Sequence, residues 1–293
     1  MTDRIVRAMA LNNNIRIFVA KTTETVKYAQ KIHQTHPATT AALGRVLSVA
    51  SVMGSSLKDD RERLIIDIRG DGALKHILVN ANNKGHVRGL VSDPEVHQVN
   101  PVTGKLDVGG IIGEGTLSVS QEFDGNTIFN SQVPLQTGEI GDDFAYYFFQ
   151  SEQLPSALSV GVLVNEDGTV NSAGVILVQV LPSASEDDIS IIEHVFAGLK
   201  PVSTIMQEME AIDVAKALFN DVEIMSESDV QYFCGCNKTQ MRDALRTLNA
   251  QDLNEMIEED KGATLECHYC HTSFKFEEDE LQALLDEKKD IQA

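Results

Sequence analysis

The sequence contains the stretch QYFCGCNKTQ at residues 231–240 and the stretch ECHYCHTSFKF at residues 266–276. Thirty residues separate the second cysteine of the first stretch from the first cysteine of the second. These two stretches hold all four cysteines of the 293-residue chain: Cys234, Cys236, Cys267 and Cys270. Two closely spaced pairs can place four sulfurs at the corners of a tetrahedron, the geometry of a closed structural zinc site with Zn–S bonds of roughly 2.3 Å. The spacing therefore predicts one Zn²⁺ per chain, bound by the four thiolates of the reduced protein.

Other uses of these cysteines have less support from the sequence. Permanent disulfides are rare in the reducing cytosol, where we expect this chain to lie. A thiol nucleophile is usually paired with a base, and the clustered cysteines look more like ligands than like one reactive group. His268 and His271 could replace ligands, but four cysteines already complete a tetrahedral set. A zinc ribbon with a purely structural role remains compatible with the spacing.

The composition indicates a soluble, acidic, globular protein. Hydrophobic residues make up 42% of the chain, which is enough for a substantial core. No run approaches about 18 apolar residues and the N-terminus lacks the apolar region of a secretory signal, so we expect a cytoplasmic protein without a membrane partner. The net charge of −20, without a basic cluster, argues against nucleic acid as a partner. From Asp221 onward, 18 acidic residues accompany 7 basic ones.

Residues 1–181 are predicted to form one α+β domain. Hairpin turns are expected at Asn12–Asn14 and at Asn165–Thr169. Asp142 or Asp143 can cap an aromatic helix that follows it. Apolar periodicity and Gly- or Asn-rich turns predict the other elements. These are helices over 23–36 and 38–57, an antiparallel meander of strands over 63–70, 74–81 and 86–93, and further strands over 116–123 and 127–135.

Residues 182–231 are predicted to form a helical linker. Ser185 and Asp188 resemble a capping box, and Pro201 suits the first turn of a second helix. The linker is too small to bury its own apolar stripes, so we expect its helices to lie on the first domain. The stripes contain Met206 and Met209, whose flexible side chains suit promiscuous apolar contacts.

Residues 232–293 are predicted to form a small zinc module, in which short helices accompany a hairpin with Cys267 and Cys270 at its turn. Such an acidic module with little core depends on the metal for folding, since apparent zinc-binding free energies are on the order of 10–16 kcal/mol. Disulfides between neighbouring cysteines would close very short loops and contribute only roughly 1.5–2 kcal/mol each. Oxidation of the sulfurs is therefore expected to unfold the module.

Several pieces of the sequence resemble the heat-shock-protein-33 family, the redox-regulated holdase chaperones of bacteria. The resemblance covers essentially the whole chain, and the two cysteine pairs with their intervening segment are its most specific part. The supporting pieces are TTETV at 22–26, GRVLSVASVMG at 44–54 and GEIGDDFAYYFFQSEQ at 138–153.

The resemblance implies an oxidative-stress chaperone that is inactive when reduced and zinc-bound. On oxidation, Cys267 and Cys270 would form a disulfide and zinc would leave, after which Cys234 and Cys236 would form a second disulfide. The linker would then loosen and apolar surface would bind unfolded client proteins without ATP. The active form would commonly be a homodimer.

Two other classes of function remain as alternatives. A zinc-ribbon adaptor would keep its metal permanently and would not respond to oxidants. An enzyme could use GGIIGEG at 109–115, but this stretch lacks the Lys-Ser/Thr of a P-loop and is expected to supply turn glycines between strands. The eight histidines show no metal-hydrolase arrangement, so we expect no enzymatic activity.

Overall fold

The computed structural model describes residues 2–292, with side chains as far as Lys288. Contacts between residues divide the chain into two compact units, one ending at Phe233 and the other beginning at Cys234. Among the described residues, no single helix is long and apolar enough to cross a membrane; α5 (Glu186–Gly198) and α6 (Val202–Glu208) meet that criterion only as a pair bent by 75°.

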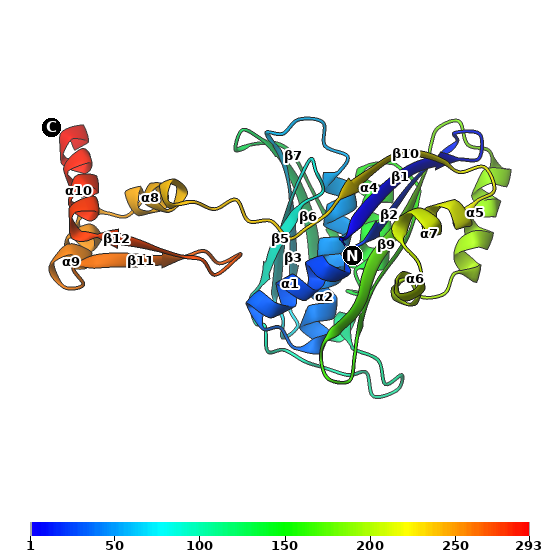
Figure 1. Cartoon of the computed structure of the whole chain (residues 1–293), viewed down its shortest axis with the longest axis horizontal. Helices are drawn as coiled ribbons and strands as arrows, with labels where there is room; N and C mark the ends of the chain where they lie inside the picture. Colours follow the sequence, from blue (N-terminus) through cyan, green and yellow to red (C-terminus); the bar gives the residue numbers. More distant parts are fainter. Residues whose placement is uncertain (1, 293) are drawn as a thin grey trace. The chain divides into compact units, whose positions relative to one another are not determined.

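The first unit contains a five-stranded antiparallel sheet with the order β10-β1-β2-β9-β8, which we call the first sheet (Figure 1). Its strands are β1 (Arg4–Ala10), β2 (Ile15–Lys21), β8 (Ser156–Val164), β9 (Val170–Val180) and β10 (Glu223–Asp229). The two predicted hairpins are confirmed. At the β1–β2 turn, Leu11, Asn12 and Asn13 have φ of 50°, 54° and 64°, and asparagine tolerates this left-handed conformation well.

A second five-stranded antiparallel sheet in the same unit has the order β5-β4-β3-β6-β7 and confirms the predicted meander. Its strands are β3 (Glu62–Gly70), β4 (His76–Asn82), β5 (Val87–Val91), β6 (Gly115–Phe123) and β7 (Asn126–Pro134). The glycine-rich stretch before β6 differs from the prediction. It forms a short helix, α3 (Val108–Ile112), because the Asp107 carboxylate accepts a hydrogen bond from the Gly110 N–H and caps it.

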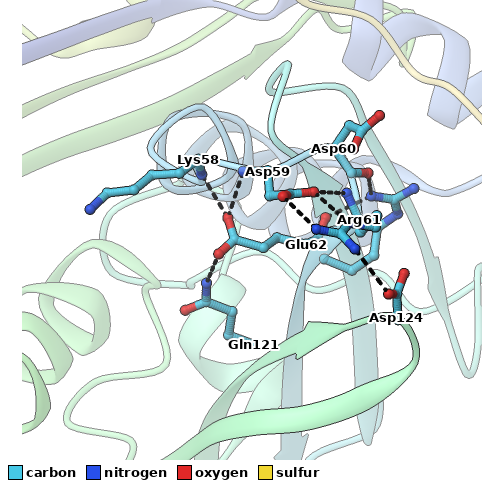
Figure 2. Close-up of polar contacts among 8 residues, drawn as sticks. Lys58, Asp59, Asp60, Arg61, Glu62, Gln121 and Asp124 are labelled. Carbon is cyan, nitrogen blue, oxygen red and sulfur yellow. Dashed lines mark hydrogen bonds and ion pairs between the residues drawn. The ribbon is translucent and has the colours of Figure 1, made fainter.

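Polar contacts fix the chain where it enters β3 (Figure 2). The Glu62 carboxylate accepts hydrogen bonds from the Lys58 and Asp59 N–H groups, at 2.6 and 3.0 Å, and from the Gln121 side chain at 3.2 Å. Arg61 pairs with Asp59 and lies over the Phe123 ring, with its guanidinium carbon 4.3 Å from the ring centroid. These contacts tie the start of β3 to the end of its neighbour β6.

The core of the first unit is built around α2 (Pro37–Gly54), whose side chains are buried on nearly every side. The helix contacts strands of both sheets, and α1 (Thr23–His33) and α4 (Gly141–Ser151) pack around the same core. Gly44 permits this close packing, since a Cβ there would lie 2.7 Å from Val26 Cγ1 and 2.9 Å from Val162 Cγ2. The helices predicted over 23–36 and 38–57 are therefore confirmed, with slightly shorter bounds.

Asp143 stabilises the start of α4 in a different way from a simple cap. The helix begins at Gly141, so Asp143 lies within its first turn. Its fully buried carboxylate accepts hydrogen bonds from four N–H groups of the preceding loop, those of Gln136, Thr137, Gly138 and Ile140, at 2.6–3.2 Å. The predicted capping role thus falls to Asp143, which orders the loop as well as the helix.

The helices α5, α6 and α7 (Ala211–Leu218) cover the face of the first sheet that points away from α2. Val6, Ile17 and Ile176 on the sheet pack in one cluster with Val202, Met206 and Val214 on the helices. This confirms that the predicted linker helices lie on the first domain. Met206 is 1% exposed, so it is part of this core.

The second unit consists of three helices, α8 (Lys238–Arg246), α9 (Ala250–Glu258) and α10 (Glu278–Gln292), and the hairpin β11 (Gly262–Glu266)–β12 (Ser273–Glu277) within residues 234–292. Its buried core is small and contains Leu245, Leu253, Ile257, Phe276, Leu281, Leu284 and Leu285. The structure as a whole confirms the predicted α+β class, with antiparallel sheets, helices and a cysteine-bearing C-terminal module.

Candidate metal centre

The four cysteines lie in two short segments of the second unit. Cys234 and Cys236 precede α8, whose first turn is capped by the Asn237 side chain, which accepts a hydrogen bond from the Gln240 N–H. Cys267 and Cys270 lie in the β11–β12 turn, where the Cys267 N–H donates to the Thr272 carbonyl at 3.0 Å and the Cys267 carbonyl accepts from the Cys270 and His271 N–H groups. Local backbone bonds therefore hold the second pair on one compact turn.

The four sulfurs form one cluster, in which all Sγ atoms lie within 4.8 Å of one another. The Sγ atoms of Cys234 and Cys267 are 3.7 Å apart, and those of Cys236 and Cys270 are 3.3 Å apart. Tetrahedral Zn–S bonds of roughly 2.3 Å would separate the sulfurs by about 3.8 Å, whereas a disulfide needs about 2.05 Å. The separations and the all-sulfur donor set therefore fit a tetrahedral zinc site, and none of the four cysteines forms a disulfide.

The environment of the thiols differs from one to another. Burial, together with hydrogen bonds among the sulfurs, raises the pKa of Cys236, and burial also raises the pKa of Cys267. Burial raises the pKa of Cys270 as well, but hydrogen bonds with the side chain and backbone of Thr272 and with neighbouring sulfurs outweigh this effect and lower it to about 7. Of these three thiols, Cys270 ionises most readily, and the thiolate is the form that binds metal and attacks oxidants.

Neither histidine of the turn belongs to the cluster. The His271 ring contacts the Glu266 carboxylate through Nδ1, and His268 is exposed. In the described part of the chain, the four cysteines are the one group of three or more His, Cys, Asp or Glu side chains close enough to share a metal ion. The alternative in which a histidine replaces a cysteine ligand finds no support in this arrangement.

The sequence resembles proteins of known family along its whole length. It matches the Hsp33 protein family over residues 3–277. The 33 kDa chaperonin of Alkaliphilus metalliredigens is 38% identical over 98% of this chain and 100% of its own length. That of Geobacillus kaustophilus is 39% identical over 97% of this chain and 98% of its own length. The chain belongs to the Hsp33 family. A crystal structure of an Hsp33 homolog from Thermotoga maritima agrees, with a TM-score of 0.89 at 34% identity over 99% of this chain and 100% of that one.

In this Hsp33 chain, sequence reasoning missed the residues directly before the first cysteine pair. Tyr232 inserts into the first unit, where its ring lies 5.3 Å from that of Tyr28 and its hydroxyl is 3.2 Å from His33 Nε2. The same hydroxyl accepts a hydrogen bond from the Gly89 N–H at 3.2 Å and donates one to the Gly89 carbonyl at 2.8 Å. A tyrosine next to a cysteine motif gives no periodic signal, so these contacts appear only in the folded chain.

Proposed function

We propose that this chain is a redox-regulated, ATP-independent holdase that binds unfolded or partly unfolded client proteins after its thiols are oxidised. The observation that carries the proposal is the cluster of four cysteine sulfurs, none in a disulfide, in a module with a small core. The family supports the chaperone role, since its curated relatives are named 33 kDa chaperonins. The proposed site is Cys234, Cys236, Cys267 and Cys270, which hold one Zn²⁺ in the reduced protein.

The stability of the module explains why oxidation would act as a switch. The four thiolates would hold zinc, whose binding would contribute a free energy on the order of 10–16 kcal/mol, comparable with the whole stability of a small domain. Oxidation of Cys267 and Cys270 by a peroxide forms their S–S bond, passes two electrons to the peroxide and, with two protons, releases two waters or their equivalent. A site left with two thiolates no longer holds the metal, and the second pair, Cys234 and Cys236, is then free to form its own disulfide.

These disulfides would not replace the lost stability. Each closes a loop of three or four residues, which is worth roughly 1.5–2 kcal/mol before any strain is counted. The module would therefore unfold, and its acidic composition would keep the unfolded chain in solution. We assign residues 1–181 to the core domain, 182–231 to a linker that loosens, and 232–293 to the redox switch. The active protein is proposed to be a cytoplasmic homodimer.

The proposal is tested by treating the reduced, zinc-loaded protein with peroxide at elevated temperature. Zinc release, thiol loss and suppression of the thermal aggregation of a client enzyme are followed in parallel, without ATP. We expect the three signals to rise together and to reverse when reductant and zinc are restored. Cys267→Ser is expected to bind zinc more weakly, and Ser273→Ala on the same hairpin serves as the control. Zinc that stays bound would favour a permanent zinc-ribbon adaptor, and zinc release without client protection would exclude the holdase.

A further inference from the structure

Residues Glu223–Phe233, which we call the edge cover, lie along the outer edges of both sheets of the first unit. The strand β10 lies beside β1 (Figure 1). The two strands pair antiparallel over most of their length, from Arg4↔Asp229 to Met9↔Glu223. Beyond it, the Val230 N–H donates to the Asp3 carbonyl, and residues 231–233 then lie parallel to β5. One continuous segment thus occupies two strand edges that would otherwise be open.

The β10 part of the edge cover is held mainly by its backbone. Six of the seven β10 side chains are exposed, and Ile224 is half-buried. The ion pair between Arg4 and Asp229, at 3.1 Å, is also exposed, and such pairs contribute little to stability. Two residues before the segment, the Asp221 carboxylate accepts hydrogen bonds from the Leu11 and Asn12 N–H groups at 3.0 and 2.9 Å. A strand that binds through its backbone can be replaced by another strand of different sequence.

The edge strand of the second sheet, β5, also forms hydrogen bonds with the edge cover. The Val87 N–H donates to the Gln231 carbonyl at 3.0 Å, and the Phe233 N–H donates to the Val87 carbonyl at 2.8 Å. Gly89 is the next residue of β5 on this side, and the Tyr232 hydroxyl bonds both its N–H and its carbonyl. The cover therefore satisfies successive backbone groups of β5, those of Val87 through its own backbone, as a neighbouring strand would, and those of Gly89 through the Tyr232 side chain.

The strand β1 would become an edge strand if β10 left, and it carries buried apolar side chains on both of its faces, although Arg7 on the Ile5 face is only half-buried. Ile5 is 2% exposed in the central core, while Val6 and Ala8 are fully buried in the cluster beneath the linker helices. Natural edge strands are commonly protected by prolines, bulges or inward-pointing charges, since a long apolar edge pairs readily with other chains. A β1 edge without β10 would thus be a template for an extended polypeptide.

We propose that unfolded clients bind this protein by strand addition, in which an extended client segment replaces the edge cover on β1 and β5. The inference rests on the proposed function and names the surface and the chemistry of recognition. Backbone hydrogen bonds would supply binding with little dependence on sequence, as strand addition does in other complexes. Departure of Asp229 and Glu227 also frees Arg4 from both carboxylates that it faces, which favours client segments that carry acidic residues beside apolar ones.

Amide hydrogen exchange in the full-length protein tests the proposal in three states: reduced, oxidised, and oxidised with bound client. We expect the amides of β1 that face β10 to exchange roughly tenfold or more faster after oxidation and to regain protection when client binds. The amides of β10 itself should stay unprotected in the client complex. The exchange rates of the β9 amides should be the same in all three states. Renewed protection of β10 with client bound would mean that the cover has returned, and this result would overturn the proposal.

A labelled peptide with the sequence of residues 223–233 provides an independent test. We expect it to bind the oxidised protein roughly tenfold or more tighter than the reduced protein and to compete with client. The control peptide carries Ser226→Pro and Glu227→Pro. Successive residues of a strand direct their N–H groups to opposite sides, so one of the two prolines must remove a bond to β1. Equal binding of both peptides, or binding that leaves client in place, would overturn the proposal.

The same two substitutions in the full-length protein open the edge without oxidation. We expect the Ser226→Pro/Glu227→Pro variant, while reduced and zinc-bound, to bind the wild-type peptide, and the matched Ser226→Ala/Glu227→Ala variant not to bind it. Failure of the proposed function is distinguishable from failure of this inference. An oxidised protein that releases zinc but protects no client would contradict the proposed holdase function. Client protection without competition from the peptide would contradict only the proposal that clients bind by strand addition.

Discussion

The Tyr232 hydroxyl offers the sharpest test of how the segment before the cysteine-bearing module is held. Replacing Tyr232 with phenylalanine keeps the ring and its contact with Tyr28 but removes the group that bonds the N–H and carbonyl of Gly89. Gly89 is buried, so water cannot readily take the place of the hydroxyl. The substitution should therefore loosen the edge cover without disturbing the core.

The size of the effect follows from the hydrogen bonds that are lost. A hydrogen bond contributes a net 0.5–1.5 kcal/mol in typical cases, and a buried donor left without a partner costs roughly 1–3 kcal/mol. For Gly89 we take about 2 kcal/mol as the loss in free energy of docking, which corresponds to roughly a thirtyfold increase in the population of the undocked segment. The cysteine cluster itself keeps all four of its sulfurs in this variant.

Amide exchange in the reduced protein measures this population directly. The Val87 and Phe233 amides, which bond across the cover, should exchange roughly thirtyfold faster in Tyr232→Phe, while the amides of β2 and β9 should not change. Tyr28→Phe is the matched control, since it removes a hydroxyl from the neighbouring ring of the same stack. A change of less than threefold at Val87 and Phe233, or equal acceleration throughout the first unit, would refute the reasoning.

Three further changes test the stability of the second unit and of two sites in the core of the first unit. Chelating zinc from the reduced protein should unfold residues 234–292 and leave the first unit folded, which two-dimensional NMR would show as selective loss of dispersed amide signals. Asp143→Ala leaves four loop N–H groups without their acceptor and should lower the free energy of unfolding by at least about 3 kcal/mol in urea titrations, whereas Asp142→Ala should have a much smaller effect. Gly44→Ala inserts a methyl group against two valines and should cost about 1–3 kcal/mol, while Gly198→Ala, where a Cβ meets nothing within 4 Å, should be nearly neutral. Equal losses of stability in Asp143→Ala and Asp142→Ala would contradict the role given to the Asp143 carboxylate. Equal losses in Gly44→Ala and Gly198→Ala would contradict the close packing at Gly44.

The core of the first unit was predictable because its sequence carries strong periodic signals. The 38–57 stretch is apolar almost all around, and it forms the central helix α2. The meander strands alternate or run apolar between glycine- and asparagine-rich turns, and each is found in the second sheet. The cysteine cluster was predictable for another reason, since four ligands of one type at short spacing have few geometries available to them.

The edge cover was not predictable from its sequence. The residues of β10, EIMSESD, show no apolar face and little β propensity, and all of their side chains except that of Ile224 are exposed. What makes them a strand is the open edge of β1, more than 200 residues earlier in the chain, as in the pairing of Arg4 with Asp229. The short helix α3 was missed for a similar reason, since two glycines would not start a helix without the Asp107 cap. Tertiary contacts override local propensity at both places.

The relative strength of the contacts within the linker indicates which surface opens first. The helices α6 and α7 bury Val202, Met206 and Val214 to between 1% and 3% exposure, and each such side chain is worth roughly 1.5–3 kcal/mol when fully buried. The edge cover buries only Val230 to a comparable degree, at 4% exposure. It is also the segment joined directly to the module, because Phe233 and Cys234 are consecutive residues. Unfolding of the zinc module would therefore release the strand edges at a lower free-energy cost than the apolar face beneath the helices. Client capture through backbone pairing can then begin while the sheet that supports it remains folded and covered on its opposite faces.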